Sequence, residues 1–251
     1  MQAKKIVFLA SDCESSRWVY HALKADLSFA AAIIEEPVSK RTLFKNRMKK
    51  IGFVKVVGQA LFSLLVVPVL AMQARKRKAA LIAEYHLNSN DFDGTVVHVS
   101  SVNDDTCLQT LKYLQPDIVL VNGTRIISNK ILQNIPAVFI NTHVGITPKY
   151  RGSHGGYWAL YNNDEASFGT TIHLVNSGVD TGDILKQVFV KPAKEDNFTT
   201  YPVLQVAAGI ALLKQVLQDV MNNNHTAIKL TEKGRLYYQP AIWEYFKKRT
   251  R

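Results

Sequence analysis

The feature that most constrains the fold is the alternation of short Val- and Ile-rich runs with segments of helical length. Seven runs have the length and composition of buried strands: Lys5–Ala10, Phe29–Glu35, Thr95–Val99, Asp117–Val121, Ala137–Ile140, Gly169–Val175 and Ile184–Val190. Helix-length segments separate several of them: Ser15–Ala25, Asp104–Leu114 and Gly155–Tyr161. This alternation predicts an α/β fold with a mainly parallel twisted sheet, right-handed crossovers and flanking helices.

A further long helix is predicted at about Pro202–Met221. Its apolar residues recur at helical spacing and are expected to face the sheet: Val203, Val206, Ala207, Ile210, Leu213, Val216 and Leu217. The length of 251 residues and an apolar fraction of 47% fit one α/β domain with an extension. We therefore expect residues 1–251 to form a single domain.

The positive charge of the chain is concentrated in one segment. Between Pro37 and Ala80 there are eleven Lys and Arg residues and no Asp or Glu. The whole chain has a formal net charge of +11, so the remainder sums to zero. A basic surface over the whole molecule is therefore not predicted, and we expect no nucleic-acid partner.

An insertion at about 38–82 combines this charge with a strongly apolar run, Val56–Met72. The run is shorter than the ~20 apolar residues of a transmembrane helix, contains Gln59 and Pro68, and has basic clusters on both sides. Three interpretations stay open. The insertion is a helical hairpin packed on the domain or on a second subunit of a homodimer, a helix in the surface of an anionic membrane, or a spanning helix.

The cysteines and the N-terminus bear on the cellular compartment. Cys13 and Cys107 are far apart and predict neither a disulfide framework nor a metal site. No signal-peptide apolar region precedes the first strand-like run. We expect a cytoplasmic protein, peripheral at the inner membrane surface if the insertion meets lipid.

Three polar side chains of different chemistry stand at the ends of predicted strands. Asn141 and His143 follow the Ala137–Ile140 run, and Asp180 follows the turn after Gly169–Val175. Ligands of open α/β sheets bind at the carboxyl ends of the strands, so these residues are candidates for a site. Each could also be structural, Asn141 and Asp180 by stabilising their own turns.

The surrounding residues form a spaced pattern: Asn141-x-His143, Pro148, Tyr150-Arg151-Gly152 and Val179-Asp180-x-Gly182. This pattern resembles that of the 10-formyltetrahydrofolate-dependent formyltransferases, which include methionyl-tRNA, glycinamide ribonucleotide and amino-sugar N-formyltransferases. The chain looks most like the amino-sugar enzymes. The resemblance implies a Rossmann-like formyltransferase fold and 10-formyltetrahydrofolate as the formyl donor. Val144-Gly145 departs from the Pro-Ser of many relatives, and the insertion matches neither of the two best-known members.

The three polar residues suit formyl transfer, and the resemblance implies the same catalytic roles. The Asn141 amide can donate to the oxyanion. His143 can donate a second hydrogen bond or act as acid or base. Asp180 can orient His143, favour its charged form and accept the amine proton, directly or through water. No covalent intermediate is required, and no metal is expected. We interpret His173, inside a strand run, as a supporting or structural residue.

Further residues are expected to bind the two substrates. The resemblance implies that the loop after Asp117–Val121 and the turn 175–178 hold the pterin ring of the donor. The residues concerned are Thr124, Arg125, Ile126, Ile127, Val175, Asn176, Ser177 and Gly178. The residues expected at the acceptor are Ser15, Ser16, Lys149, Tyr150, Arg151 and His154. Ser15 or Ser16 is also expected to cap the first helix.

We expect the acceptor to be a primary amine on a nucleotide-linked amino sugar used in surface polysaccharide synthesis. The alternatives are an enzyme like methionyl-tRNA or glycinamide ribonucleotide formyltransferase, and a non-catalytic, membrane-associated binding module. The tRNA alternative is less favoured for two reasons. The charge lies in one insertion, and only about sixty residues follow the last predicted strand. The tRNA-formylating relatives carry a separate C-terminal β-barrel domain.

Overall fold

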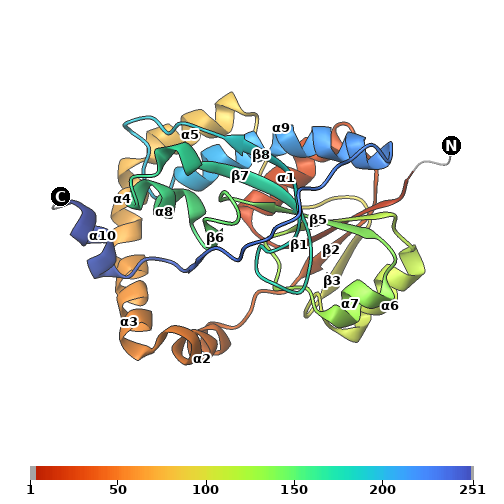
Figure 1. Ribbon diagram of the computed structural model, residues 1–251, viewed down its shortest axis with the longest axis horizontal. Coiled ribbons are helices and arrows are strands. Elements are labelled where there is room, and N and C mark those ends of the chain that lie inside the picture. Colours follow the sequence, from red (N-terminus) through yellow and green to blue (C-terminus); the bar gives the residue numbers. More distant parts are fainter. Residues whose placement is uncertain (1–3, 250–251) are drawn as a thin grey trace.

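A seven-stranded sheet forms the centre of the computed structural model, which describes residues 4–249 (Figure 1). Its strands are β1 (Ile6–Ser11), β2 (Phe29–Glu35), β3 (Val96–Val99), β4 (Ile118–Asn122), β5 (Val138–His143), β7 (Gly169–Leu174) and β8 (Ile184–Phe189). The spatial order is β3-β2-β1-β4-β5-β7-β8. The first five run parallel, and β7 and β8 are antiparallel to their neighbours. The predicted mainly parallel sheet is confirmed.

Helices cover both faces of the sheet (Figure 1). On one face α1 (Glu14–Lys24) and α9 (Tyr201–Met221) pack on a cluster that includes Phe8 of β1. On the other, α6 (Asp105–Leu114) and α7 (Asn129–Asn134) pack on a cluster that includes Val7 and Leu9. Because both faces are covered, the central strands are continuous apolar runs without polar alternation.

Helix α9 begins where Pro202 occupies its first turn and buries the whole predicted apolar face. It is one of two helices in residues 4–249 that are long and apolar enough to cross a bilayer; the other is Phe53–Gln73. Most of α9 is buried against β7, β8 and α1. Its apolar composition is therefore that of a core helix.

The insertion is helical throughout, as predicted. It comprises α2 (Lys40–Ile51), α3 (Phe53–Leu61), the π-helical turn η1 (Phe62–Val66), α4 (Val67–Gln73) and α5 (Arg75–Glu84). The stretch 53–73 runs as one continuous helix through η1. Pro68 has no backbone N–H to donate, so it interrupts the hydrogen-bond ladder of the helix. The backbone just before it is a π-helical turn. Gly52 at φ +82° makes the corner between α2 and α3.

The insertion packs on the body through an aromatic cluster. Phe62 and Leu70 meet Tyr157 and Trp158 of α8 (Gly155–Tyr161) together with Phe198. Arg77 of α5 forms a two-point salt bridge to Asp196, whose side chain is fully buried. The helix α10 (Ile242–Arg249) contacts α3. Packing of the insertion against the domain is therefore part of the structure.

One strand boundary differs from the sequence prediction. Strand β5 does not end at Ile140 but continues to His143, because β7 pairs with its end and sets Asn141 opposite His173 and His143 opposite Thr171. Asn141 and His143 thus lie within a strand.

The remaining short elements are η2 (Glu165–Ser167) and a two-stranded sheet of β6 (Arg151–Gly152) and β9 (Leu236–Tyr237).

Candidate active site

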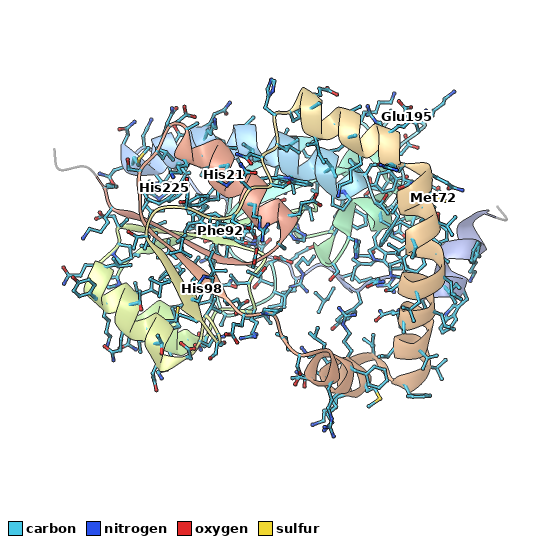
Figure 2. All side chains as sticks on the ribbon, turned by 180° about the vertical axis from the view of Figure 1, so that it is seen from behind. His21, Met72, Phe92, His98, Glu195 and His225 are labelled. Atoms are coloured by element: carbon cyan, nitrogen blue, oxygen red, sulfur yellow. The ribbon has the colours of Figure 1, made fainter. Side chains whose placement is uncertain are left out.

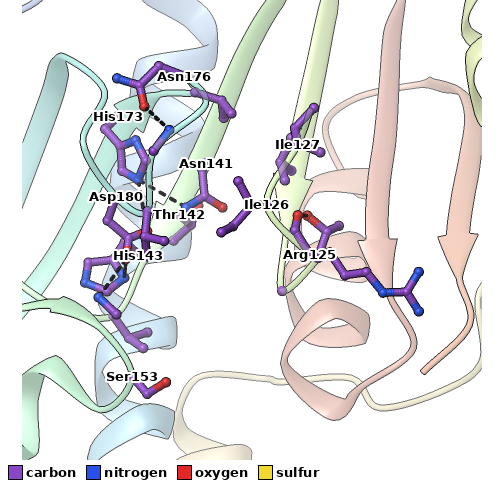
Figure 3. Close-up of a pocket in the computed structure, with 18 residues that line it drawn as sticks. Arg125, Ile126, Ile127, Asn141, Thr142, His143, Ser153, His173, Asn176 and Asp180 are labelled. Atoms are coloured by element: carbon purple, nitrogen blue, oxygen red, sulfur yellow. Dashed lines mark hydrogen bonds and ion pairs between the residues drawn. The ribbon is translucent and has the colours of Figure 1, made fainter. Parts of the chain in front are cut away.

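A cavity of about 400 Å³ opens beside the ends of β4, β5 and β7. Figure 3 shows its lining, with Asn141, His143, His173 and Asp180 on one side and the Arg125–Ile127 loop on the other. Ten of the predicted catalytic and donor-binding residues line it: Thr124, Arg125, Ile126, Ile127, Asn141, His143, Val175, Asn176, Gly178 and Asp180. The structure therefore brings together the residues expected for catalysis and for the formyl donor.

Four polar side chains form a connected array along one wall. Asn141 Nδ2 lies 3.1 Å from His173 Nε2, and His173 Nε2 lies 3.6 Å from Asp180 Oδ1. On the other side of the carboxylate, Asp180 Oδ2 lies 3.4 Å from His143 Nδ1. Each member thus contacts the next, which holds the carboxamide and both imidazoles in fixed relation to one carboxylate (Figure 3).

Both ring nitrogens of His143 face hydrogen-bond acceptors. Nε2 lies 2.8 Å from the carbonyl of Tyr150, which can only accept, so Nε2 carries a hydrogen. Nδ1 faces the Asp180 carboxylate at 3.4 Å. The ring is therefore oriented by an acceptor at each of its two nitrogens. Gly145 leaves room for this arrangement, because a β-carbon there would overlap His143 Nε2 and the Tyr150 carbonyl.

His173 differs from His143 in its partners, since one ring nitrogen faces a carbonyl and the other faces a side-chain amide. Its Nδ1 lies 2.7 Å from the Leu174 carbonyl and therefore donates to it. Its Nε2 lies near both Asn141 Nδ2 and Asp180 Oδ1, so it can accept from the Asn141 amide when it carries no hydrogen, or donate to the Asp180 carboxylate when it does. The second N–H of the Asn141 amide stays available to a ligand in the cavity.

Asp180 is ionised, and the backbone of its turn sets the position of its side chain. Burial alone would raise its pKa, but the charge of His143, the hydrogen bond of His173 and the N–H of Gly152 outweigh it and hold the pKa at about 2. The backbone of Asp180 is left-handed, with φ +47°. A β-carbon on Gly182 would overlap the Leu174 carbonyl, so the turn that carries Asp180 requires glycine there.

We expect the contribution of Asp180 to stability to depend on pH. Because its folded-state pKa of about 2 is below the ordinary 3.8, the carboxylate stabilises the native state above pH 3.8 and loses this effect as the pH falls toward 2. Asp180→Asn should therefore lower the free energy of unfolding by about 2 kcal/mol at neutral pH, and by less in acid. Urea unfolding of both proteins over this pH range checks this; a gap that widens in acid would contradict it.

The loop after β4 presents backbone and apolar surface to the cavity, and the side chain of Arg125 points away from it (Figure 3). The Arg125 backbone N–H donates to the buried Glu35 carboxylate, and its guanidinium donates to the carbonyls of Ser100 and Glu36. Ile126 is 47% exposed at the cavity and Ile127 is buried. Arg125 thus fixes the loop, while the isoleucines supply its apolar wall.

The opposite turn is held by Asn176, whose Oδ1 accepts from the Gly178 N–H and the Thr181 hydroxyl. Val175, Asn176 and Gly178 line the cavity, whereas Ser177 is absent from the lining. The two loops therefore face each other across the space available to a flat ring.

The residues expected at the acceptor are not gathered in this cavity. The Tyr150 side chain is buried and donates to Asp164, which Lys149 also contacts at 3.3 Å. The Arg151 guanidinium donates to the carbonyls of Gly234 and Val179. Tyr150 enters the site through its carbonyl, and Arg151 fastens the loop of Asp180.

The remaining acceptor candidates lie at two other places. Ser15 and Ser16 are in the first turn of α1, and the residue at its N-cap is Cys13, so the expected capping by a serine is wrong. Ser16 is buried and donates to the side chain of Asn122, because helix α1 packs beside the end of β4. The ring of His154 packs on Phe198, with the two ring centroids 4.4 Å apart. Burial, and to a lesser extent the nearby charge of Arg47, lowers the pKa of His154 to about 4.

His173 is the site residue that sequence reasoning undervalued. It contacts both Asn141 and Asp180 and lines the cavity. The signal that would have found it is the antiparallel register that sets His173 opposite Asn141, which is a long-range property of the sheet. Ser153, exposed in the lining, was also not predicted.

The formyl transferase family pattern matches residues 4–204, and the chain belongs to this family. It is 33% identical over 125 residues to a methionyl-tRNA formyltransferase of Finegoldia magna, covering 49% of this chain and 40% of that protein. It is 30% identical over 142 residues to the methionyl-tRNA formyltransferase of Thermodesulfovibrio yellowstonii, covering 56% of this chain and 45% of that protein. The chain thus matches less than half the length of these curated relatives.

Solved structures share the fold. A phosphoribosylglycinamide formyltransferase from Anaplasma phagocytophilum superposes with a TM-score of 0.59 at 14% identity, covering 94% of this chain and all of that one (100%). An N-formyltransferase from Helicobacter canadensis, in complex with folinic acid and dTDP-3-aminofucose, superposes with a TM-score of 0.56 at 16% identity, covering 92% and 70%. The Rossmann-like formyltransferase fold is therefore confirmed.

Proposed function

We propose that this protein transfers a formyl group from 10-formyltetrahydrofolate to a primary amine. The observation that carries the proposal is the Asn141–His173–Asp180–His143 array on the wall of the cavity. The array offers an amide donor, an imidazole and an ionised carboxylate around one space, a set suited to acyl transfer to an amine.

Each member has a distinct task. The free N–H of Asn141 stabilises the negative charge that grows on the formyl oxygen during attack by the amine. His143, oriented by Asp180 at its Nδ1, acts as the general acid that supplies a proton for the leaving nitrogen. Asp180 has a pKa of about 2 and cannot store a proton for long. It holds both imidazoles and passes the proton of the amine onward to water.

The cavity suits the pterin end of the donor. Its volume of about 400 Å³ lies within the ~300–1,000 Å³ common for small-molecule sites. Ile126, Ile127 and Val175 offer apolar walls, and the backbone of the 123–127 loop offers donors and acceptors. The bound donor would supply the activated formyl group to this wall of polar residues.

We expect Ile126→Glu to weaken donor binding without unfolding the protein. Ile126 is 47% exposed, so the fold loses little, but a carboxylate against the aromatic ring removes an apolar contact and costs desolvation. Calorimetric titration with folinic acid should show a Kd raised about tenfold or more. Tyr113→Glu, at an 87% exposed residue of α6, is the matched control. Equal affinities of the two variants would contradict this placement of the ring.

For the acceptor we propose a nucleotide-linked amino sugar. The first turn of α1 lies beside Gly123 of the cavity lining, and the hydroxyls of Ser11, Ser15 and Ser16 converge there on Cys13. Burial would raise the pKa of Cys13, yet these hydrogen bonds lower it, which indicates surroundings that favour negative charge. A phosphate of the acceptor would be stabilised at such a helix N-terminus.

Aminoacyl-tRNA is the second candidate, and the similarity to methionyl-tRNA formyltransferases favours it. The distribution of charge favours the sugar, because tRNA binding needs cations spread along the docking face. Lys149 and Arg151, the basic residues nearest Asn141 in the sequence, are engaged with Asp164 and with backbone carbonyls.

A competition between acceptors tests the proposal. Nucleotide-linked amino sugars, glycinamide ribonucleotide and charged initiator tRNA are mixed with the protein and a formyl-labelled donor, and the label is followed in each. We expect the label in the sugar fraction. Efficient labelling of the tRNA or of glycinamide ribonucleotide, with none in the sugars, would overturn the choice of acceptor.

A further inference from the structure

The outer face of the 53–73 helix exposes seven large apolar side chains. The exposed large apolar residues of this helix are Phe53 and Val54 at its start and, at spacings of one, three or four positions, Leu61, Leu64, Leu65, Val69 and Met72. Leu64 and Met72 are each 72% exposed and Val54 is 71% exposed. We call this set the apolar stripe. Figure 2 labels Met72 on this helix, which runs along the edge of the molecule. Exposed apolar surfaces of this kind mark interaction sites.

The opposite side of the same helix is fastened to the body. Phe62 is fully buried among aromatic rings, and the side chain of Gln59 donates to the Gln239 carbonyl. Gly58 allows Trp243 to approach so closely that a β-carbon there would overlap the indole ring. The helix is thus packed on the body by one side and offers its outer face to a partner.

Uncompensated positive charge flanks both ends of the apolar stripe. Arg41, Lys45, Lys49 and Lys50 are exposed on α2, and Arg75 and Lys76 are exposed at the start of α5. These six form no salt bridge with any residue in the described range 4–249. By contrast Lys55, Arg77 and Lys78 are paired with Glu244, Asp196 and Glu14.

We propose that the apolar stripe docks in the surface of an anionic lipid bilayer, with the helix parallel to the membrane plane. Apolar side chains would enter the boundary between headgroups and acyl chains, and the flanking basic residues would contact anionic headgroups. The helix, 21 residues and therefore ~31 Å long, has the size of known interfacial helices.

The charge pattern favours lipid over a second copy of this chain. Because both ends of the stripe are basic, parallel and antiparallel pairing of two such helices would each bring like charges together. An anionic bilayer complements both ends at once. The docking face is distinct from the cavity wall, so the inference goes beyond the proposed catalytic function.

Vesicle flotation with the full chain tests the inference. We expect binding to vesicles of phosphatidylcholine with phosphatidylglycerol, and much weaker binding to phosphatidylcholine alone. Binding should fall steeply in ~1 M salt, where the screening length is ~3 Å. A protein that stays in solution with the anionic vesicles at low salt would overturn the proposal.

Paired variants locate the contact. Leu64→Glu with Leu65→Glu should lower partitioning onto the vesicles at least ~tenfold, because two apolar contacts with lipid are lost. Both side chains are exposed, so the fold should stay intact. Lys49→Gln with Lys50→Gln should lower it about fivefold per charge. The controls are Tyr113→Glu and Lys112→Gln on α6, which should bind like the wild type.

Two outcomes of this comparison would reject the lipid assignment. Unchanged partitioning of the leucine variant would show that another surface binds the vesicle. A wild-type dimer in light scattering that Leu64→Glu converts to monomer, with no effect on vesicles, would assign the stripe to contact between copies. Donor binding to the variants, measured with folinic acid, confirms that the folded cavity is retained in either case.

Discussion

Asn141→Ala and His143→Ala should each lower the rate of formyl transfer by ~10²–10³ while the protein stays folded. Asn141 provides the free amide N–H at the cavity, and His143 is held between the Tyr150 carbonyl and Asp180. Both act on charge that develops only during the reaction, so the rate constant kcat should fall more than donor affinity. Steady-state assays together with folinic acid titration separate the two quantities.

The matched control for this prediction is His98→Ala. His98 lies exposed on the edge strand β3, labelled in Figure 2, and is not part of the cavity lining. It should leave turnover unchanged. Near-normal turnover in His143→Ala would remove His143 from the mechanism, and with it the role assigned to the Asp180 carboxylate.

Phe62→Ala should destabilise the protein by ~3–5 kcal/mol, the largest stability effect expected in the insertion. Phe62 is fully buried, with its ring 4.9 Å from Phe198 in edge-to-face contact and 5.1 Å from Tyr245. Truncation would leave a cavity between the insertion and α8, the helix that follows the Pro148–Gly152 loop. Guanidinium unfolding measures the change in free energy.

Leu64→Ala is the natural comparison because it removes a similar apolar side chain two residues away. Leu64 is 72% exposed, so its truncation should change the free energy of unfolding by less than about 0.5 kcal/mol. Equal losses in the two variants would show that the helix is not anchored by the side the structure indicates. The interfacial docking proposal would lose its basis with that result.

Local sequence patterns predicted much of this fold. The continuous apolar runs of β1 and β4 reflect strands covered on both faces, and the helical spacing in α9 gave its buried side. The insertion was predicted to be helical from its composition alone. The donor-binding loops followed from the resemblance, since they come directly after strands.

Features that depend on long-range pairing were not accessible in the same way. The extension of β5 through His143 requires β7 beside it, and the contact of His173 with Asn141 requires the register between them. Similarly, Tyr150 and Lys149 look like ligand-binding residues locally, but Asp164 contacts both of their side chains. The sequence places these groups near the site, and only the packing decides which atoms face the cavity.

Turnover of the formyl donor distinguishes an enzyme from a binding module. Wild-type protein is incubated with 10-formyltetrahydrofolate and a nucleotide-linked amino sugar, and both products are followed by mass spectrometry. We expect tetrahydrofolate and an N-formylated sugar in equal amounts, with neither formed by His143→Ala. Tight binding of the folate without release of tetrahydrofolate, whichever amine is supplied, would contradict this expectation and identify the protein as a non-catalytic binding module.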